Sequence, residues 1–159
     1  MHVLLATDAQ WVVDEIVAAL SGPDTSFTVC RNGRDVVPVV EKRTPDIAIL
    51  DMQSGSMGGM AVTMNLRLDE SAGALPHIPV LMLLDRAADV FLARRSGTDG
   101  WLMKPLNPLA IQRAVHQILN PPAPPVPDGD GQIDIDETDE TDETTAAPVT
   151  PEEQPAAAG

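Results

Sequence analysis

The sequence predicts an α/β domain, a doubly wound parallel sheet of five strands in (βα)₅ order, followed by a C-terminal tail of different composition. Short apolar runs recur at regular intervals, and each is too short for a helix. Their apolarity is continuous, which is typical of strands buried on both faces of a parallel sheet. The intervals between them have helical spacing, and right-handed crossovers then give a sandwich of three layers. The expected strands are Val3–Ala6, Phe27–Cys30, Ile47–Leu50, Val80–Leu84 and Trp101–Met103.

Each expected strand is followed by an expected helix. The first helix ends at Ser21-Gly22-Pro23, because glycine and proline stop a helix. Its helix-spaced residues are Trp11, Val12, Glu15, Ile16 and Ala19. The second helix lies within Asn32–Arg43 and contains Pro38, so it either starts late, near Asp35, or is kinked.

The other three helices are predicted from spacing and from one cap. The helix-spaced residues of the third are Met57, Met60, Met64 and Leu68. We expect these methionines to fill the core rather than to form a binding stripe. The fourth helix is expected over Asp85–Arg95, and in the fifth Asn107 and Pro108 suit the N-cap and the first turn. The residues of the fifth helix expected to face inward are Leu109, Ala114, Val115 and Ile118.

The charge of the chain is concentrated in its last part. The formal net charge is −14, from 24 acidic and 10 basic residues. Eleven of the acids and none of the bases lie from Pro121 onward, so residues 1–120 hold 13 acids against 10 bases. A module that binds nucleic acid needs a basic face to neutralise phosphates, so we exclude nucleic acid as a partner.

We expect residues 1–119 to form the folded domain and residues 120–159 to be a proline-rich, acidic tail of low complexity. The tail opens with a proline run, Pro121–Pro127, and continues with an acidic run, Asp134–Glu143. It offers little apolar surface to bury, so disorder is expected. Three roles are open: a segment that is phosphorylated on its threonines and so gains negative charge, an inert solubilising segment, or an acidic strap that lies on a basic groove of a larger partner protein.

Nothing in the sequence indicates secretion or direct membrane insertion. The lone cysteine, Cys30, has no internal disulfide partner, which favours a reduced compartment. The N-terminus lacks the basic segment and the cleavage site of a signal peptide. No apolar stretch approaches the roughly 20 residues that span a bilayer. We expect a cytoplasmic protein that reaches the inner face of the membrane only through a partner.

Charged residues follow several of the expected strands. Asp8 follows the first strand, Asp51 the third, Asp85 the fourth and Lys104 the fifth. In a doubly wound sheet the functional crevice lies outside the carboxyl ends of the strands. Carboxylates and an ammonium group at that edge suit Mg²⁺ and a phosphoryl group.

With these residues in place, the sequence resembles the receiver domains of bacterial two-component response regulators, which have a flavodoxin-like fold. The motifs that carry the resemblance are Pro45–Asp51, Gly59, Ile78-Pro79-Val80 and Gly97–Pro105. The resemblance implies that Asp51 is the phosphoacceptor and that Lys104 pairs with the phosphoryl group. It also implies that Asp8, Asp51 and the backbone carbonyl of Gln53 are the Mg²⁺ ligands, and it implies no other cofactor.

The sequence departs from this family pattern at four places, one of which is Gly55-Ser56, where Pro-Gly is usual after the phosphoacceptor. Thr7 stands where receivers usually carry a further acid, which weakens a Mg²⁺ site built from oxygen ligands and charge. Leu84 stands where a Thr or Ser usually binds the phosphoryl oxygen and couples it to the loop. Asp85 stands where a small residue is usual, and its charge could lie near an incoming phosphate. We therefore expect Mg²⁺ binding to be weak or absent.

The resemblance also implies a partner-binding surface on the fourth helix, the fifth strand and the fifth helix. Trp101 holds the aromatic position of that surface, and Arg94 and Arg95 lie beside it. An aromatic residue flanked by arginines suits an interface anchor. The alternative is that Trp101 is mostly buried and that the arginines form a solvated helix end.

From these features we expect an atypical receiver that acts as a docking or regulatory subunit on another protein and is not an enzyme. The alternative is a phosphorylatable single-domain response regulator that accepts phosphate on Asp51 from a histidine kinase. A flavin enzyme is disfavoured because the loop Thr7-Asp8-Ala9-Gln10 lacks a glycine-rich phosphate cradle. No effector domain follows Leu119, which argues against a DNA-binding regulator. Within the family the sequence is most similar to orphan receivers associated with respiratory NADH dehydrogenase, so that complex is an expected partner.

Overall fold

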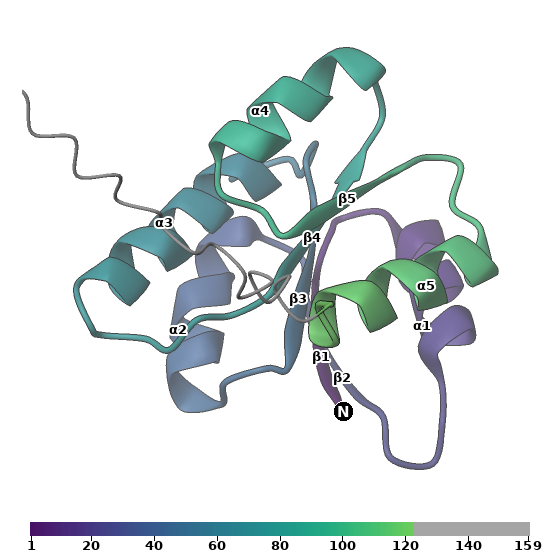
Figure 1. Cartoon of the computed structure of the whole chain (residues 1–159), viewed down its shortest axis with the longest axis horizontal. Helices are drawn as coiled ribbons and strands as arrows, with labels where there is room; N and C mark the ends of the chain where they lie inside the picture. Colours follow the sequence, from purple (N-terminus) through teal and green to yellow (C-terminus); the bar gives the residue numbers. More distant parts are fainter. Residues whose placement is uncertain (123–159) are drawn as a thin grey trace, which may run out of the picture. The chain divides into compact units, whose positions relative to one another are not determined.

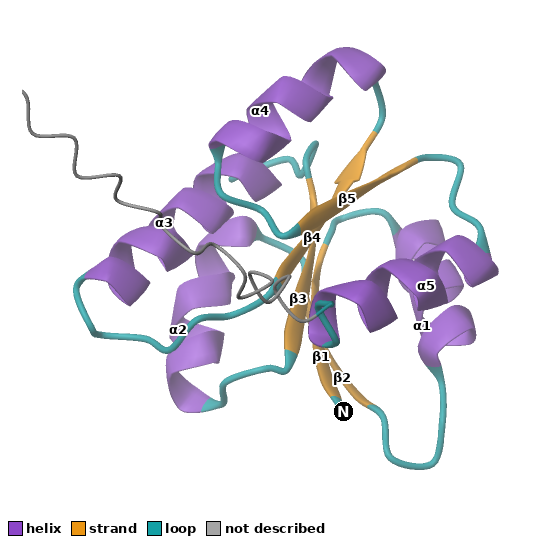
Figure 2. Ribbon diagram, viewed as in Figure 1, coloured by secondary structure: helices purple, strands orange, loops and turns teal. Residues whose placement is uncertain are grey.

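The structure is a computed structural model that describes residues 1–122, so the predicted tail from residue 123 onward lies outside the described residues. Strands and helices alternate along the chain, as Figure 2 shows in orange and purple. The strands are β1 (His2–Ala6), β2 (Ser26–Cys30), β3 (Ile47–Asp51), β4 (Val80–Leu84) and β5 (Gly100–Met103). The helices are α1 (Gln10–Leu20), α2 (Val36–Lys42), α3 (Gly59–Ser71), α4 (Val90–Arg95) and α5 (Pro108–Leu119), with 3₁₀ turns η1 (Gly33–Asp35) and η2 (Ala87–Asp89).

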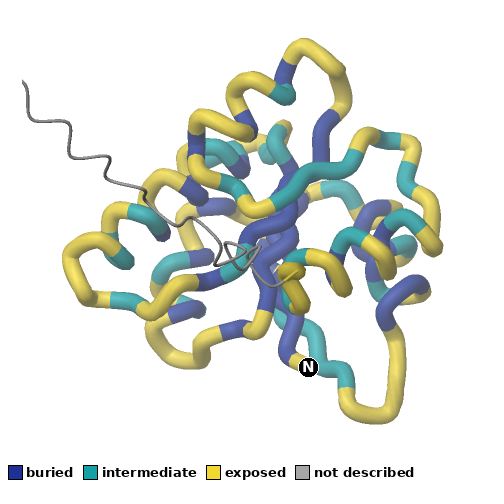
Figure 3. The backbone as a smooth tube through the Cα atoms, in the orientation of Figure 1, coloured by how far each residue is buried: buried dark blue, intermediate teal, exposed yellow. Residues whose placement is uncertain are grey.

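The five strands form one parallel sheet in the order β2-β1-β3-β4-β5 (Figure 1). Helices α1 and α5 cover one face of the sheet, and α2, α3 and α4 cover the other, so the doubly wound α/β prediction is confirmed. All residues of β1, β3 and β4 are buried, and they form the dark blue centre of Figure 3. In β1, Val3 and Leu5 join the core of α1 and α5, whereas Leu4 and Ala6 join the core of α2 and α3. The unbroken apolar runs follow from this burial on both faces.

The second and fourth helices are shorter than the segments predicted for them. α2 begins at Val36, directly after η1, which confirms the late start and not the kink. Pro38 therefore lies in the first turn of the helix, where proline is tolerated. The first part of the predicted fourth helix, Asp85–Arg95, forms η2 rather than α-helix. Within residues 1–122, no helix combines the length and the apolar character needed to cross a membrane.

The core role predicted for the methionines of the third helix is only partly confirmed. Met64 is 52% exposed, contrary to prediction, whereas Met57 precedes the helix and packs against the core of α2 and the sheet. Val62 and Leu66 provide the buried face instead, because they meet the core formed by α2 and the sheet. Apolar residues occur on more than one side of this helix, and tertiary packing decides which side is buried. Leu68 is 66% exposed on the outer side.

The inward face of α5 agrees with the prediction except at one residue. Val115 is buried, and Ala114 and Ile118 pack against the same core. Leu109 is 61% exposed, contrary to prediction. It lies in the first turn, where the side chain of Asn107 accepts a hydrogen bond from its backbone N–H at 2.9 Å, so the predicted N-cap is confirmed.

Candidate functional site

A cavity of about 390 Å³ opens at the carboxyl ends of the parallel strands. β1 leads towards Asp8, β3 ends at Asp51 and β5 leads into Lys104, so three strands bring these side chains to one edge of the sheet. The residues that line the cavity are Asp8, Ala9, Trp11, Asp51, Gln53, Asp85, Arg86 and Lys104. The structure therefore places the residues predicted for the metal and the phosphoryl group in a single cavity.

Asp51 is the buried centre of this cavity, and only 2% of its side chain is exposed. The Lys104 ammonium donates to both carboxylate oxygens, at 2.8 Å to Oδ1 and 3.0 Å to Oδ2. The Thr7 hydroxyl donates to Oδ2 at 2.9 Å, and the backbone N–H of Gln53 donates to Oδ1 at 3.2 Å. A buried carboxylate needs such partners to remain charged. Each oxygen of Asp51 is thus already engaged by the protein's own donors.

The oxygen atoms around Asp51 are of the kind that binds Mg²⁺, but few of them belong to carboxylates. Asp8 is exposed, and its Oδ2 accepts a hydrogen bond from the backbone N–H of Gly55 at 3.1 Å. Thr7 adds no carboxylate, and its hydroxyl is committed to Asp51. Among residues 1–122, no three acidic, histidine or cysteine side chains gather as metal ligands. If Mg²⁺ binds, Asp8, Asp51 and the backbone carbonyl of Gln53 would hold it, and two carboxylates give a weak site.

Lys104 is shared between Asp51 and a further carboxylate. Its side chain is 10% exposed, and its Nζ lies 3.1 Å from Oδ2 of Asp85, a rim residue whose side chain is 41% exposed. The ring of Trp11 lies over the same ammonium group, with 5.7 Å between Nζ and the ring centroid. The sequence interpretation gave Trp11 no site role, although it is 48% exposed and forms a wall of the cavity. Its position in the first turn of the helix after Asp8 is the signal that could have identified it.

Leu84, directly before Asp85, ends β4 inside a small apolar cluster. It is fully buried and packs with Met82 and with Ala93 of α4. Trp101 packs against the same cluster. The strand end that borders the cavity is thus connected to the ring of Trp101 through apolar contacts.

Trp101 is partly buried, and the guanidinium group of Arg94 lies 4.8 Å from the centroid of its ring. Arg95 is exposed at the end of α4. Two apolar side chains of the same elements are also open to solvent, Phe91 of α4 at 66% and Met103 of β5 at 38%. We call Phe91, Arg94, Arg95, Trp101 and Met103 the α4–β5 face. This face combines an aromatic ring, a stacked cation and exposed apolar surface.

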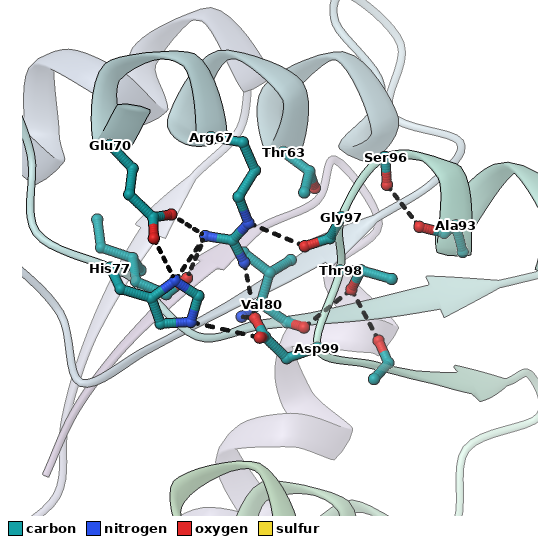
Figure 4. Close-up of polar contacts among 12 residues, drawn as sticks. Thr63, Arg67, Glu70, His77, Val80, Ala93, Ser96, Gly97, Thr98 and Asp99 are labelled. Carbon is teal, nitrogen blue, oxygen red and sulfur yellow. Dashed lines mark hydrogen bonds and ion pairs between the residues drawn. The ribbon is translucent and has the colours of Figure 1, made fainter. Parts of the chain in front are cut away.

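An ion-pair network at the opposite edge of the sheet fixes the loop that leads into β5 (Figure 4). Arg67 of α3 donates to the carboxylate of Asp99 at 2.7 Å and to the backbone carbonyl of Gly97 at 2.8 Å. His77 lies between two carboxylates, 2.8 Å from Glu70 and 3.3 Å from Asp99. Burial alone would raise the pKa of Glu70, but the hydrogen bond and charge of His77 and the charge of Arg67 lower it overall. The network ties α3 to the start of β5.

Residues 3–116 match the family model of the response regulator receiver domain. The DNA-binding response regulator MtrA of Mycolicibacterium smegmatis is 27% identical over 140 residues, which cover 84% of this chain and 59% of MtrA. The chain thus spans about three fifths of the length of that relative, 59%. A response regulatory protein of Mycobacterium tuberculosis, described as uncharacterized, is 31% identical over 101 residues, which cover 64% of this chain and 73% of that protein.

A likeness to solved structures supports the same fold. The crystal structure of the receiver domain of a sensor histidine kinase from Pseudomonas aeruginosa contains a magnesium ion coordinated in its active-site cleft. It matches this chain with a TM-score of 0.62 and 20% identity, over 74% of this chain and 96% of that one. At this level of identity the likeness shows the fold alone.

Proposed function

The chain belongs to the response regulator receiver family, and we propose that it acts as a protein-docking module whose aspartate cavity does not switch its docking face. The family is one of two-component signalling proteins. The finer proposal rests on one observation: Leu84 is fully buried against α4 in the cluster that Trp101 packs on.

Leu84 separates a phosphoryl group on Asp51 from the α4–β5 face in two ways. Its side chain offers no hydrogen bond, so it cannot bind a phosphoryl oxygen as the Thr or Ser of other receivers does. It also belongs to the buried apolar cluster against which Trp101 packs, and protein interiors are packed so closely that the ring could move inward only by displacing part of this cluster. A phosphoryl group on Asp51 would therefore have no polar contact at Leu84 through which to move the α4–β5 face.

The α4–β5 face has the composition of an interface anchor. Tryptophan and arginine are enriched among the residues that carry binding energy; Trp101 is stacked by Arg94, and Arg95 is exposed at the end of the same helix. Phe91 adds exposed apolar area. The occupant that fits is a protein surface with apolar residues and carboxylates. Respiratory NADH dehydrogenase as that partner stays a prediction from sequence resemblance, as does a strap role for the acidic tail, which lies outside the described residues.

Phosphate acceptance on Asp51 is the second candidate function, because the cavity retains the nucleophile and its cation. The Asp51 carboxylate would attack the phosphorus of a phosphohistidine on a histidine kinase, forming a P–O bond while the P–N bond breaks, and Lys104 would neutralise the developing charge. The kinase histidine would leave with the electron pair of the P–N bond and take up a proton. Mg²⁺, when bound, would neutralise further negative charge in the cavity.

Capture of the binding partner tests the docking function. The full-length chain, a version that ends at Asn120, and three full-length variants would be used in native affinity purification with mass spectrometry. The variants are Asp51→Asn, Trp101→Ala and, as a control at an exposed apolar residue of another helix, Met64→Ala. We expect Asp51→Asn and Met64→Ala to retain the protein captured by the unmodified chain and Trp101→Ala to lose it.

The opposite pattern would support the phosphoacceptor function. Capture that needs Asp51 and increases after treatment with acetyl phosphate and Mg²⁺ would show that docking depends on the modification. Because Trp101 is partly buried, the double variant Arg94→Ala/Arg95→Ala provides a second test on exposed side chains. Retention of the partner by both face variants would rule out the α4–β5 face.

A further inference from the structure

We propose that Asp85 hinders the binding of phosphoryl-type anions in the cavity, because its carboxylate occupies a position on Lys104 that an incoming anion would need. This inference rests on the proposed function and deepens it, since it explains how the cavity is kept from responding to phosphoryl-type anions. Asp85 acts through Lys104 and is therefore a positioning and specificity residue.

Lys104 uses all of its hydrogen-bond donors within the protein. A lysine ammonium group has three donors and no acceptor. Its contacts are Oδ1 of Asp51 at 2.8 Å, Oδ2 of Asp51 at 3.0 Å and Oδ2 of Asp85 at 3.1 Å, so all of its donors are engaged within the protein. An anion that binds to Lys104 must therefore displace one of these three oxygens, and the one at the exposed rim of the cavity belongs to Asp85.

The charged side chains that line the cavity disfavour an incoming anion. The lining contains the carboxylates of Asp8, Asp51 and Asp85 and the cations of Arg86 and Lys104. Arg86 does not balance the excess, because its Nε and Nη2 each donate to a carboxylate oxygen of Asp89 at 3.0 Å. Asp89 is itself buried, which holds this pair together. An anion thus meets a cavity whose carboxylates outnumber its available cations.

Trp11 lies near Lys104 in the cavity wall and provides a means of measurement. Its ring lies 5.7 Å from Nζ and forms part of the cavity wall. The chain has only one further tryptophan, Trp101. In a Trp101→Phe background, fluorescence therefore reports on the cavity alone.

Beryllofluoride with Mg²⁺, titrated into the full-length chain in this background, is the experiment. We expect Asp85→Asn to bind the anion more tightly, by a factor on the order of ten, because a unit negative charge a few ångströms away in a wet cavity is worth roughly that much. Asp85→Glu should bind as weakly as the unmodified chain. Asp14→Asn, the same change at an exposed α1 residue that does not line the cavity, should have no effect.

Salt and metal titrations separate an electrostatic effect from a structural one. The difference in beryllofluoride affinity between Asp85→Asn and the unmodified chain should shrink as NaCl is raised, because screening weakens the repulsion that the substitution removes. A titration with Mg²⁺ alone shows how much of this difference comes from a change in metal affinity. The inference is overturned if Asp85→Asn binds no more tightly than the unmodified chain, if Asp14→Asn gains equally, or if the advantage is independent of salt.

The failure of this inference is distinguishable from the failure of the proposed function. If none of the variants binds the anion, Asp85 is not the barrier, and the docking function stands. If the chain with both tryptophans binds tightly and the surroundings of Trp101 change, the docking function fails, whatever Asp85 does.

Discussion

Replacement of Leu84 by threonine tests whether this side chain separates the cavity from the α4–β5 face. Leu84 is fully buried beside Trp101 and α4. The substitution replaces four side-chain carbons by two carbons and a hydroxyl oxygen, and the net loss of one heavy atom from the cluster costs about 1 kcal/mol. It also buries a hydroxyl group in apolar surroundings, which costs about 1–3 kcal/mol more. We therefore expect the free energy of unfolding to fall by about 2–4 kcal/mol, measured by urea denaturation.

Leu84→Val is the matched control, because valine has nearly the shape of threonine without the hydroxyl. It should cost only about 1 kcal/mol. The functional measurement is NMR of the two tryptophan indole N–H signals while beryllofluoride and Mg²⁺ are added. We expect the Trp101 signal to shift with bound anion in Leu84→Thr and to stay unchanged in Leu84→Val.

One result would refute this reasoning about Leu84. If the Trp11 signal shows that the anion is bound to Leu84→Thr and the Trp101 signal does not move, the missing hydroxyl is not what uncouples the cavity from the face. An equal response of Leu84→Val would assign the effect to side-chain volume instead.

Three further predictions concern the rest of the domain. Arg67→Met removes the guanidinium group that donates to two backbone carbonyls and two carboxylates, and we expect it to lower the free energy of unfolding by about 2–4 kcal/mol in thermal denaturation. The pKa of Glu70 is lowered in the folded state, so its contribution to stability is present above its unfolded pKa of about 4.3 and is lost as the pH falls through the folded value. Glu70→Gln should therefore flatten the loss of stability below about pH 5. Burial, and then the charge of Asp35, raise the pKa of Cys30, so native alkylation at pH 8 should be much slower than in urea.

Each of these predictions has an outcome that would contradict it. An unchanged thermal midpoint in Arg67→Met would show that the loop before β5 is held by other contacts. The same acid-side slope in Glu70→Gln would exclude this carboxylate from the pH dependence. Alkylation of native Cys30 at the rate of the unfolded chain would show that its thiol is accessible.

The strands and the main site residues could be predicted from sequence because their signals are local. A run such as Val80–Leu84 is apolar throughout only when both faces are buried, and the strand-end rule then brings Asp51 and Lys104 to one edge. The buried face of α3 could not be predicted in this way, because apolar residues occur on several of its sides. Val62 is buried and Met64 is exposed because of the elements that pack on the helix.

The contacts between distant residues were also beyond the sequence pattern. Arg67 and Asp99 are 32 residues apart, and neither stands in a motif that indicates their ion pair. The sharing of Lys104 between Asp51 and Asp85 depends on side-chain directions at three strand ends. The place of the exposed Trp11 ring in the cavity wall likewise depends on the direction of its side chain, which the sequence pattern does not determine.

The proposed separation between cavity and docking face can be measured directly in the unmodified full-length chain. The two indole N–H signals report on the two regions independently, because Trp11 lines the cavity and Trp101 belongs to the α4–β5 face. With beryllofluoride and Mg²⁺ at a concentration that saturates the Trp11 shift, we expect the Trp101 signal to remain where it is. Movement of both signals with the same concentration dependence would show a coupled switch and contradict a constitutive docking module.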